Sequence, residues 1–479
     1  MPIYGHRDKQ GAVICPWMRN NRKTIVAGGT IAEMGKLVTR GKRRLYVYAG
    51  KFMHLALLGY IVKWSVIGSL VGVLTGSGSA LFLAALDAVT QQRLHHPWLL
   101  WLLPLGGALV SYLYWKYGKD ASKGNNLILE QIHDGGGAIP LRMAPLVLFG
   151  TILTHWFGGS AGREGTAVQM GGSLSEWIGK RLRLSPADRR IILMCGISSG
   201  FGSVFGTPLA GTVFGLEVLA VGMIRYESLF ACFVASFIGD LTTKAWGIHH
   251  IHYSVNTIPA ITLITVLKVV LASMVFGLAS ILFSELTHWL KARFTGWFRN
   301  PAVKSFAGGC ILIAIVYAFG TREYLGLGLP LISDAFEGTA PKLAFLWKTV
   351  FTSLTLGAGF QGGEVTPLFV IGATLGSTLA GLLHLAVPFM AALGFIAVFS
   401  GATNTPIACF IMGIELFGSG NLVYMFIACV VSYYFSGHTG IYVSQRIGVS
   451  KSRLLRLPEQ ATLASVRKKG RQKGKKERG

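Results

Sequence analysis

Two glutamate-bearing stretches decide the fold of this chain: residues 162–166 read GREGT, and residues 362–367 read GGEVTP. After each stretch and a further apolar run, a Thr-Pro pair opens a second apolar segment that ends near a glutamate. The proline and the glutamate of that segment are Pro208 and Glu217 in the first half, and Pro406 and Glu415 in the second. The same features occur twice, in the same order and at nearly the same spacing, which predicts two related halves.

Repeated halves with glycine-interrupted apolar segments at matching positions are typical of membrane transporters, whose binding site lies where the halves meet. Chance is the alternative, because glycine and proline are frequent in membrane helices. So many features in matched order argue against chance. We therefore expect a transport site where the two halves meet.

The composition is that of a membrane protein. Hydrophobic residues make up 52% of the chain and charged residues only 14%, whereas soluble domains carry about 25% charged residues. The 62 glycines suit helices that pack closely or break. Apolar runs follow one another from residue 52 to residue 435, beginning with 52–75 and 79–91, and several are shorter than the ~20 residues of a full crossing. This pattern predicts a polytopic protein with tilted, broken and re-entrant helices.

The net charge of +25 gathers mainly at the two ends of the chain, in residues 1–51 and 463–479. Basic ends stay in the cytoplasm by the positive-inside rule, and the loop at 180–190 is expected there too. A basic tail can also bind nucleic acid, but no nucleic-acid partner is expected here. We expect a transport domain at 52–445 between cytoplasmic segments at 1–51 and 446–479, in a cell membrane such as the bacterial inner membrane.

Two smaller features bear on the start of the chain and on cofactors. Met34 precedes a basic stretch that suits the start of a membrane protein, so translation is expected to begin there. The six cysteines are widely spaced, which predicts neither a disulfide framework nor a metal site. We expect no cofactor.

Three glycine-bounded polar clusters interrupt the apolar sequence: GNNLI at 124–128, GREGT at 162–166 and GEVTP at 363–367. A glycine-rich turn at the start of a helix leaves free backbone N–H groups at the positive end of the helix dipole. Such an end binds anions. Three of them aimed at one point predict a site that surrounds a dehydrated anion with donors, without placing a full positive charge in lipid.

These clusters, their order and the repeat resemble the CLC family of anion channels and antiporters. Residues 162–165 match the family's Gly-Arg-Glu-Gly core, and residues 202–217 resemble the proline-containing helix that follows it. The resemblance covers about residues 70–442. It implies an all-α polytopic membrane protein, an inverted repeat of two halves with broken and re-entrant helices around a central anion site. It also implies a homodimer with one pore in each subunit.

Three departures from the chloride-type members resemble the fluoride-exporting branch, the CLC-F fluoride/proton antiporters. The first cluster reads GNNLI in place of GSGIP, and the third has Glu364 and Val365 in place of an apolar residue and Phe. The acid that chloride-type antiporters use for internal proton transfer should follow Glu217, where Val218 stands. The resemblance therefore implies export of fluoride from the cytoplasm in exchange for protons. The alternative is a CLC-type channel or proton-coupled antiporter for chloride or nitrate.

Glu164 is the first candidate site residue. A carboxylate at membrane depth is costly and marks a functional site. The resemblance implies that Glu164 gates the pathway and couples it to protons. The ionised side chain would occupy the anion site, and the protonated side chain would leave it. A structural ion pair with Arg163 is the alternative. Glu364 is expected to relay protons or contact fluoride. Its alternative role is to cap the helix that begins near Thr366, because a carboxylate suits a helix N-terminus.

The residues expected to bind the anion are Asn125, Gly162, Gly165, Thr366 and Tyr442. Fluoride holds its water tightly, so its site must replace that water with short, strong hydrogen bonds. The Asn125 amide and the Thr366 hydroxyl supply such donors, and the resemblance places Tyr442 near the inner mouth. Plainer roles are a turn residue for Asn125, an N-cap for Thr366 and an interfacial tyrosine for Tyr442.

An enzymatic function is less consistent with the sequence. Glu164 and Glu364 would then form a general acid/base pair. The chain has no His-Glu-x-x-His motif and no Gly-x-Ser-x-Gly elbow, and it is not expected to be an enzyme. The histidines within 249–252 are expected to lie in an interfacial loop, and Glu217 and Glu415, at equivalent helix ends, are expected to be structural.

Overall fold

The computed structural model describes residues 31–135, 137–250, 253–255, 257–452, 458 and 460–468, with side chains from residue 54 onward. The side chains of the predicted segment 1–51, Met34 included, lie outside that description, as do His252 and the end of the basic tail. Residues 1–60 and 61–479 are two separate units. The second unit, which contains the C-terminal part of α1 (Ile31–His95), is described below.

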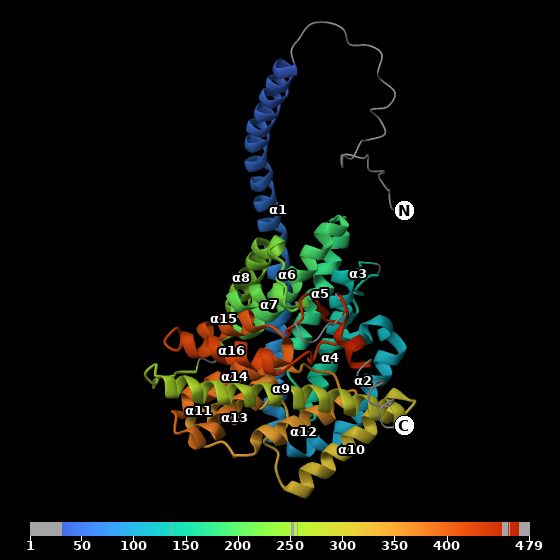
Figure 1. Ribbon diagram of the computed structural model, residues 1–479. Helices are drawn as coiled ribbons and strands as arrows, with labels where there is room; N and C mark the ends of the chain where they lie inside the picture. The colour runs from blue at the N-terminus through green and yellow to red at the C-terminus, as the bar shows by residue number, and fades with distance from the viewer. Residues whose placement is uncertain are drawn as a thin grey trace, which may run out of the picture. The chain divides into compact units, whose positions relative to one another are not determined.

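Helices make up nearly all of the regular structure in the described residues (Figure 1). After α1 the first half contains η2 (Pro97–Leu102), α2 (Leu103–Leu113), η3 (Tyr114–Gly118), η4 (Lys119–Lys123), α3 (Asn125–Asp134), α4 (Met143–Trp156), α5 (Glu164–Arg181), α6 (Pro186–Phe205), α7 (Pro208–Glu217), η5 (Tyr226–Ser228) and α8 (Leu229–Ala245). The second half contains α9 (Leu263–Trp297), α10 (Pro301–Phe319), α11 (Leu329–Glu337), α12 (Ala344–Gly357), α13 (Val365–Leu383), α14 (Val387–Thr403), α15 (Pro406–Phe417) and α16 (Leu422–Phe435). The expected all-α fold class is confirmed, apart from one pair of two-residue strands, β1 (Ala220–Val221) and β2 (Arg446–Ile447).

Six helical segments of the described chain are long and apolar enough to cross a membrane: His54–His95, Pro97–Lys123, Tyr226–Ala245, Leu263–Trp297, Pro301–Phe319 and Val365–Leu383. The apolar helices α4, α14, α15 and α16 are shorter than the ~20 residues of a full crossing. Long and short apolar helices therefore occur together, as the sequence predicted for a polytopic protein with broken helices.

Helix boundaries depart from the apolar pattern in two places. The runs at 52–75 and 79–91 predict a break between them, but α1 continues through both. Gly76 lies between the runs, and a Cβ on it would stand 2.5 Å from the carbonyl oxygen of Gly239 in α8. This glycine therefore serves close helix packing. Conversely, the unbroken run at 366–400 is divided between α13 and α14, which has a proline in its first turn.

Helices α7 and α15 show how the two halves are related. Glu217, the last residue of α7, accepts hydrogen bonds from two backbone N–H groups in the first turn of α15, at 3.2 and 2.8 Å. Glu415, near the end of α15, accepts two from the first turn of α7, at 2.9 and 2.8 Å. Each helix is capped by a glutamate of the other, so the two run antiparallel, as an inverted repeat requires. Both glutamates thus have the structural role expected from the sequence.

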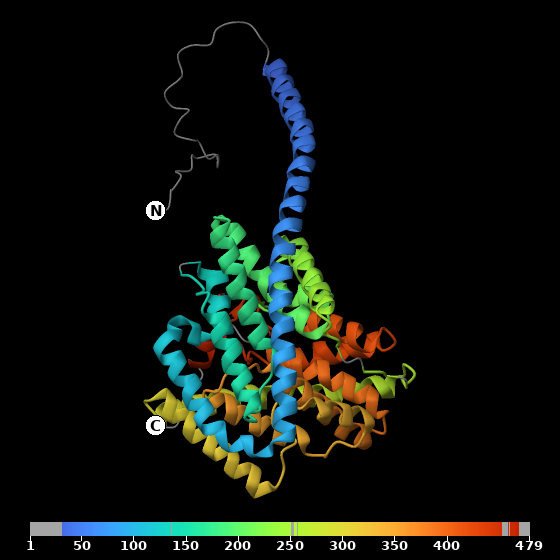
Figure 2. The ribbon, with the colours of Figure 1, turned by 180° about the vertical axis from the view of Figure 1, so that it is seen from behind.

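Other helices that are distant in the sequence also pack side by side. Figure 2 shows α2 of the first half beside α10 of the second, and Figure 1 shows α9 running across α12 and α14. Within the halves, α5 packs on α6 as α13 packs on α14. These two pairs follow the two glutamate-bearing stretches, so they are the matching parts of the repeat.

The start of the predicted tail at 446–479 packs against the helical domain. Strand β2 pairs in parallel with β1, and Leu463 joins a buried cluster with Val221, Tyr433 and Ile447. The backbone N–H of Leu463 donates to the carbonyl of Gln445 at 3.0 Å. The packed part of the chain therefore extends beyond residue 445, while the cytoplasmic location of this segment stays a prediction.

Candidate functional site

The two glutamate-bearing stretches meet backbone to backbone. Gly162 N donates to Gly363 O, and Gly363 N donates to Gly162 O, both at 2.7 Å. This antiparallel bridge brings together the first residues of α5 and α13. Two helix N-termini, each with free N–H groups and the positive end of a dipole, therefore begin in one small region.

The glycines at this junction leave no room for side chains. A Cβ on Gly162 would stand 2.9 Å from Glu164 Oε2 and 3.0 Å from Thr366 N. A Cβ on Gly165 would stand 3.1 Å from Asn125 Nδ2. Gly162 and Gly165 thus allow the two stretches and the start of α3 to approach closely. Their part in binding the anion stays a prediction.

Glu164 is fully buried, with 0% of its surface exposed, and its carboxylate lies at the N-terminus of α13. Its Oε2 accepts hydrogen bonds from Thr366 N at 3.0 Å and Arg163 N at 3.1 Å. Its Oε1 accepts one from the Thr366 hydroxyl. Backbone N–H groups at a helix start are the donors that bind anions, so the Glu164 side chain lies where an anion is expected to bind.

Arg163 holds this carboxylate less closely than a structural ion pair, the alternative role for Glu164, would require. Its Nε lies 3.8 Å from Glu164 Oε1, within ion-pair range but too far for a hydrogen bond. That Nε is buried and has no hydrogen-bond partner among the described residues. The direct side-chain hydrogen bond to Glu164 comes from Thr366 instead, which favours the anion-like role over a simple ion pair.

Glu364 does not cap its helix. It occupies the N-cap position of α13, but its side chain makes no capping hydrogen bond, so the helix-cap alternative for Glu364 is wrong. The N–H of Thr366 in that first turn donates to Glu164 of the other half instead. The Glu364 side chain lines a cavity.

Asn125, Glu364 and Tyr442 line one cavity of about 620 Å³, which we call the lysine cavity. Of the described residues that line it, Glu364 is the only acid and four are lysines: Lys119, Lys123, Lys291 and Lys304. Among the described residues only Lys123 of these four has an ion-pair partner, Glu130 at 2.9 Å. The structure therefore brings three predicted site residues together in a positively charged space.

Thr366 and Arg163 line a second cavity, of about 470 Å³, together with two histidines of the loop at 247–250. We call it the histidine cavity. These histidines lie in a loop, as the sequence predicted, and they face this cavity. Glu364 and Thr366 are close neighbours in the chain but line different cavities. The segment that joins them, with Glu164 bonded to it, therefore lies between the two spaces.

Asn125 and its neighbour Asn126 have different environments. Asn126 accepts a hydrogen bond from Ser444 N at 3.0 Å, so it ties the start of α3 to the C-terminal segment. Asn125 is the first residue of α3, and its Oδ1 is buried without a hydrogen-bond partner in the described part of the chain. An amide that shapes a turn commonly bonds to its own backbone, and no such bond is found in the described residues, while binding of the anion by Asn125 stays a prediction.

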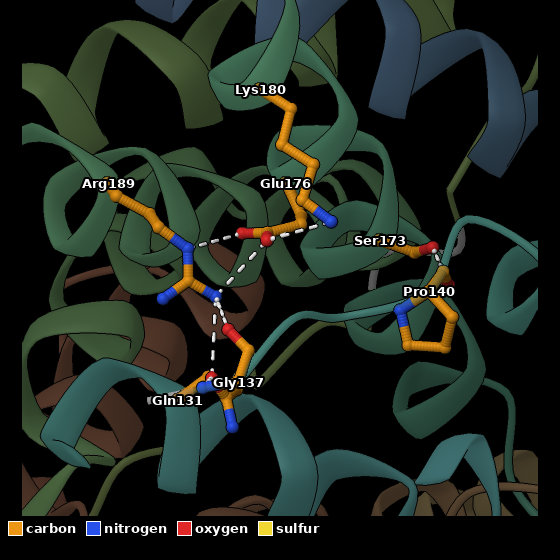
Figure 3. Close-up of polar contacts among 7 residues, drawn as sticks. All are labelled: Gln131, Gly137, Pro140, Ser173, Glu176, Lys180 and Arg189. Atoms are coloured by element: carbon orange, nitrogen blue, oxygen red, sulfur yellow. Dashed lines mark hydrogen bonds and ion pairs between the residues drawn. The ribbon is translucent and has the colours of Figure 1, made fainter. Parts of the chain in front are cut away.

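An ion-pair network holds the other end of the contact between α3 and α5 (Figure 3). Arg189 of α6 donates twice to the carboxylate of Glu176 on α5, at 2.8 and 3.1 Å, and once to Gly137 O after α3, at 3.0 Å. Its third partner is Gln131 Oε1 of α3, at 3.4 Å. Lys180 lies 3.4 Å from the same carboxylate. The network ties α3 and α5 to α6, so the two helices that start at the site are held in register.

Two buried polar residues were not predicted. Gln169 of α5 lines the lysine cavity, and its position one helical turn after Gly165 was a usable signal, because such residues share a helix face. Lys348 of α12 is fully buried and donates to two loop carbonyls at 3.1 and 2.8 Å. A lone lysine in the apolar run at 343–358 was the signal for it.

The site defines a class of protein. Among the described residues, no group of three or more His, Cys, Asp or Glu side chains is arranged to hold a metal ion. What the described residues offer is a buried carboxylate, that of Glu164, at a helix N-terminus between two cavities. Together with antiparallel halves and membrane-length helices, this arrangement is that of a membrane ion transporter built around an anion site.

Comparison with known proteins gives the family. Residues 106–437 match the family described as voltage gated chloride channel, and the chain belongs to this family, the CLC proteins, as its motifs predicted. It is 49% identical over 420 residues to the chloride/fluoride channel protein of Pseudomonas syringae pv. tomato. The aligned residues cover 86% of this chain and 93% of that relative.

Solved structures agree with this assignment. The crystal structure of a CLC-type fluoride/proton antiporter is 35% identical, with a TM-score of 0.78, and the match covers 80% of this chain and 98% of that one. A slow cyanobacterial Cl⁻/H⁺ antiporter is 20% identical, with a TM-score of 0.70 over 79% of this chain and 96% of that one. The second match shows the fold alone.

Proposed function

We propose that this protein exports fluoride from the cytoplasm in exchange for protons. The observation that carries the proposal is the Glu164 carboxylate at the N-terminus of α13, bonded by the backbone N–H and the hydroxyl of Thr366. A site that holds a carboxylate oxygen with these donors can hold a small anion with the same donors. The relatives whose names include fluoride support the choice of ion.

Coupling to protons follows from competition for this site. Two negative charges 4 Å apart repel by about 4 kcal/mol at an effective dielectric of 20, so fluoride enters when Glu164 is displaced or protonated. A protonated Glu164 no longer needs the donors of Thr366 and can move away with its proton. Each return of Glu164 to the site releases that proton, which links proton movement to fluoride movement in the opposite direction.

Glu364 is assigned as the second acid of the proton route. Val218 stands where chloride-type antiporters are expected to carry their internal acid, so a proton must travel by another path. Glu364 lines the lysine cavity close to Thr366 in the chain. We assign it the relay of protons between that cavity and Glu164, with the donors of Asn125 and Tyr442 binding fluoride on the same route.

Orientation and assembly complete the proposal. The lysine cavity is placed on the cytoplasmic side, and both termini with it, because Lys and Arg gather there in membrane proteins. The membrane is a cell membrane, the bacterial inner membrane, and the chain moves ions without acting as an enzyme. Apolar side chains such as Leu209, Phe233 and Phe237 are exposed on α7 and α8. Such surfaces need lipid or a second subunit, which is consistent with a homodimer in a bilayer.

The test is ion efflux from liposomes that contain the purified protein. Vesicles loaded with fluoride or with chloride are diluted into ion-free buffer, and an ion-selective electrode follows release. Fluoride should leave far faster than chloride, and Asn125→Ser should lower that ratio because it replaces an amide donor by the chloride-type residue. Equal or faster release of chloride by the unmodified protein would favour the alternative, a CLC-type chloride or nitrate transporter.

A further inference from the structure

Gln169 is a buried amide that the fold does not use. It lies in the second turn of α5, only 6% of its surface is exposed, and it lines the lysine cavity with Asn125 and Glu364. Its Oε1 is buried and has no hydrogen-bond partner among the described residues. The same holds for Oδ1 of Asn125, so two unpartnered carboxamides line one cavity.

The packing of α3 on α5 brings these two amides to the same place. Gly165 and Gln169 are four residues apart in α5 and therefore share a face of the helix. Asn125 Nδ2 lies 3.1 Å from the position of a Cβ on Gly165. The Gln169 amide atoms lie 3.4 to 3.6 Å from the position of a Cβ on Gly124, which has a left-handed backbone with φ of 61°. The start of α3 thus covers the face of α5 that carries Gln169.

Gln445 shows what a structural glutamine looks like in this chain. It is fully buried, and its Nε2 donates to Val218 O at 2.9 Å and to Thr403 O at 3.0 Å. Its Oε1 accepts from Asn404 Nδ2 at 3.0 Å. Buried polar groups are nearly always satisfied in this way, and an exception calls for an explanation such as strain, a catalytic role or a bound water or ion. Gln169 is such an exception.

We propose that Gln169 is a further fluoride-binding residue, whose carboxamide donates an N–H to the ion beside Asn125 as it passes between the lysine cavity and Glu164. This inference rests on the proposed function. The donor end of the Gln169 carboxamide is Nε2, which, unlike Oε1, is not among the buried unpartnered atoms of the described residues, so the N–H₂ group is the end that is open to the cavity. Fluoride, which needs several short hydrogen bonds to replace its water, gains a second amide donor from α5 to match the one from α3.

The test is Gln169→Met, which keeps the length of the side chain and removes its polar atoms. Replacing an unsatisfied buried polar group by an apolar one is neutral or stabilising, so the Tm of this variant should equal or exceed that of the unmodified protein. The fluoride concentration that gives half-maximal efflux from liposomes should rise roughly tenfold, as expected for the loss of a hydrogen bond to a charged ligand. The ratio of fluoride to chloride efflux should fall.

Gln445→Met is the matched control, because it removes the same group where every polar atom has a partner. It should lower the Tm and leave the half-saturating fluoride concentration of the folded protein unchanged. Gln169→Asn keeps an amide and should retain part of the selectivity.

Two results would overturn the inference: unchanged half-saturation and selectivity in Gln169→Met, or a Tm of Gln169→Met that falls as far as that of Gln445→Met. Either result would assign Gln169 a packing role. Failure of the proposed function is recognised separately, because the unmodified protein would then fail to move fluoride.

Discussion

Thr366 is the residue on which the anion-like position of Glu164 depends. Its hydroxyl and its backbone N–H both donate to the carboxylate, and hydrogen bonds to charged groups contribute about 1.5–3 kcal/mol each. Thr366→Val removes the hydroxyl and keeps the shape. We expect the fluoride concentration for half-maximal efflux to rise by about tenfold or more, measured in liposomes with a fluoride electrode.

Thr366→Ser is the control, since it keeps the hydroxyl and loses only a methyl group. It should transport fluoride nearly as well as the unmodified protein. Equal behaviour of the Val and Ser variants would mean that the backbone N–H alone makes the site and that the hydroxyl has only a local role.

A residue could be proposed as part of the site from the sequence where the motif that marks it consists of residues next to it in the chain. Glu164 lies in a glycine-bounded motif, and an acid inside an apolar chain is conspicuous. The role of Glu364 was left open between relay and cap, because that choice depends on whether Glu164 of the other half bonds the first turn of α13. Gln169 was missed for the same reason: its lack of a partner depends on the packing of α3 on α5.

At the scale of helices, the reciprocal caps of α7 and α15 predict that removing either glutamate lowers the stability of the folded protein. Glu217→Ala leaves two backbone N–H groups of α15 without acceptors, and Glu415→Ala does the same to α7. Each loss should cost about 1–3 kcal/mol per unsatisfied buried group, and Tm should fall by several degrees. Glu217 is 5% exposed and more deeply buried than Glu415. The Tm of Glu217→Ala should therefore fall further than that of Glu415→Ala, as measured by thermal unfolding followed by tryptophan fluorescence.

Glu227→Ala is the control for both variants, because the Glu227 side chain is 62% exposed and makes a surface ion pair with Arg225. Such pairs contribute about 0–1 kcal/mol. A Tm loss for Glu217→Ala no larger than that of Glu227→Ala would show that the reciprocal caps do not stabilise the repeat.

The network in Figure 3 predicts an unequal effect of its two cations. The Glu176 side chain is 2% exposed, and those of Arg189 and Lys180 are 18% and 57% exposed. Arg189→Met leaves a buried carboxylate without its main partner, which costs about 3–5 kcal/mol. Lys180→Met removes an exposed partner worth about 0–1 kcal/mol.

We therefore expect a large fall in Tm for Arg189→Met and a small one for Lys180→Met, measured side by side in detergent. Fluoride efflux should fall in Arg189→Met vesicles even at a temperature where the protein stays folded, because α3 and α5 lose their fixed register. Equal Tm values for the two variants would contradict the assignment of Arg189 as the main partner.

Helix starts were predicted best where a Thr-Pro pair opens an apolar segment, as at Pro208 and Pro406, each in the first turn of its helix. The pattern failed at Gly76, because a glycine that allows two helices to touch and a glycine that ends a helix look alike in a single sequence. Only the position of α8 distinguishes the two uses.

At the scale of the whole molecule, the two cavities differ in charge. Among the described lining residues, the lysine cavity has four lysines and one glutamate, and the histidine cavity has Arg163 and Asp87 with its histidines. A cavity lined by one sign of charge raises the local concentration of the opposite ion, and salt screens this effect over about 8–10 Å. Lys291→Gln and Lys304→Gln should therefore slow fluoride efflux several-fold at low ionic strength, and rates should converge when a large inert salt is added.

Lys123→Gln combined with Glu130→Gln is the control, because it removes a cavity lysine together with its ion-pair partner and leaves the net charge unchanged. This double variant should keep the rate of the unmodified protein. A salt-independent defect in Lys304→Gln would indicate a packing role for the lysine in place of an electrostatic one.

The relation between the halves could be predicted from the repeated order of features, because both copies carry the glutamate stretch, the Thr-Pro turn and the second glutamate. Their inverted arrangement came from the family resemblance, since order along a chain does not reveal direction in space. The crossed caps of Glu217 and Glu415 supply that direction directly.

The most direct measurement is proton pumping by a fluoride gradient in sealed liposomes, followed with a pH-sensitive dye. A gradient of fluoride out of the vesicles should drive protons inward against their own gradient, because Glu164 carries a proton each time fluoride displaces it from the donors of Thr366. Glu164→Gln, which resembles the permanently protonated side chain, should abolish this pumping while fluoride movement slows or becomes independent of protons. If Glu164→Gln vesicles still move protons against their gradient, Glu164 is not the coupling residue and the proposed mechanism is wrong.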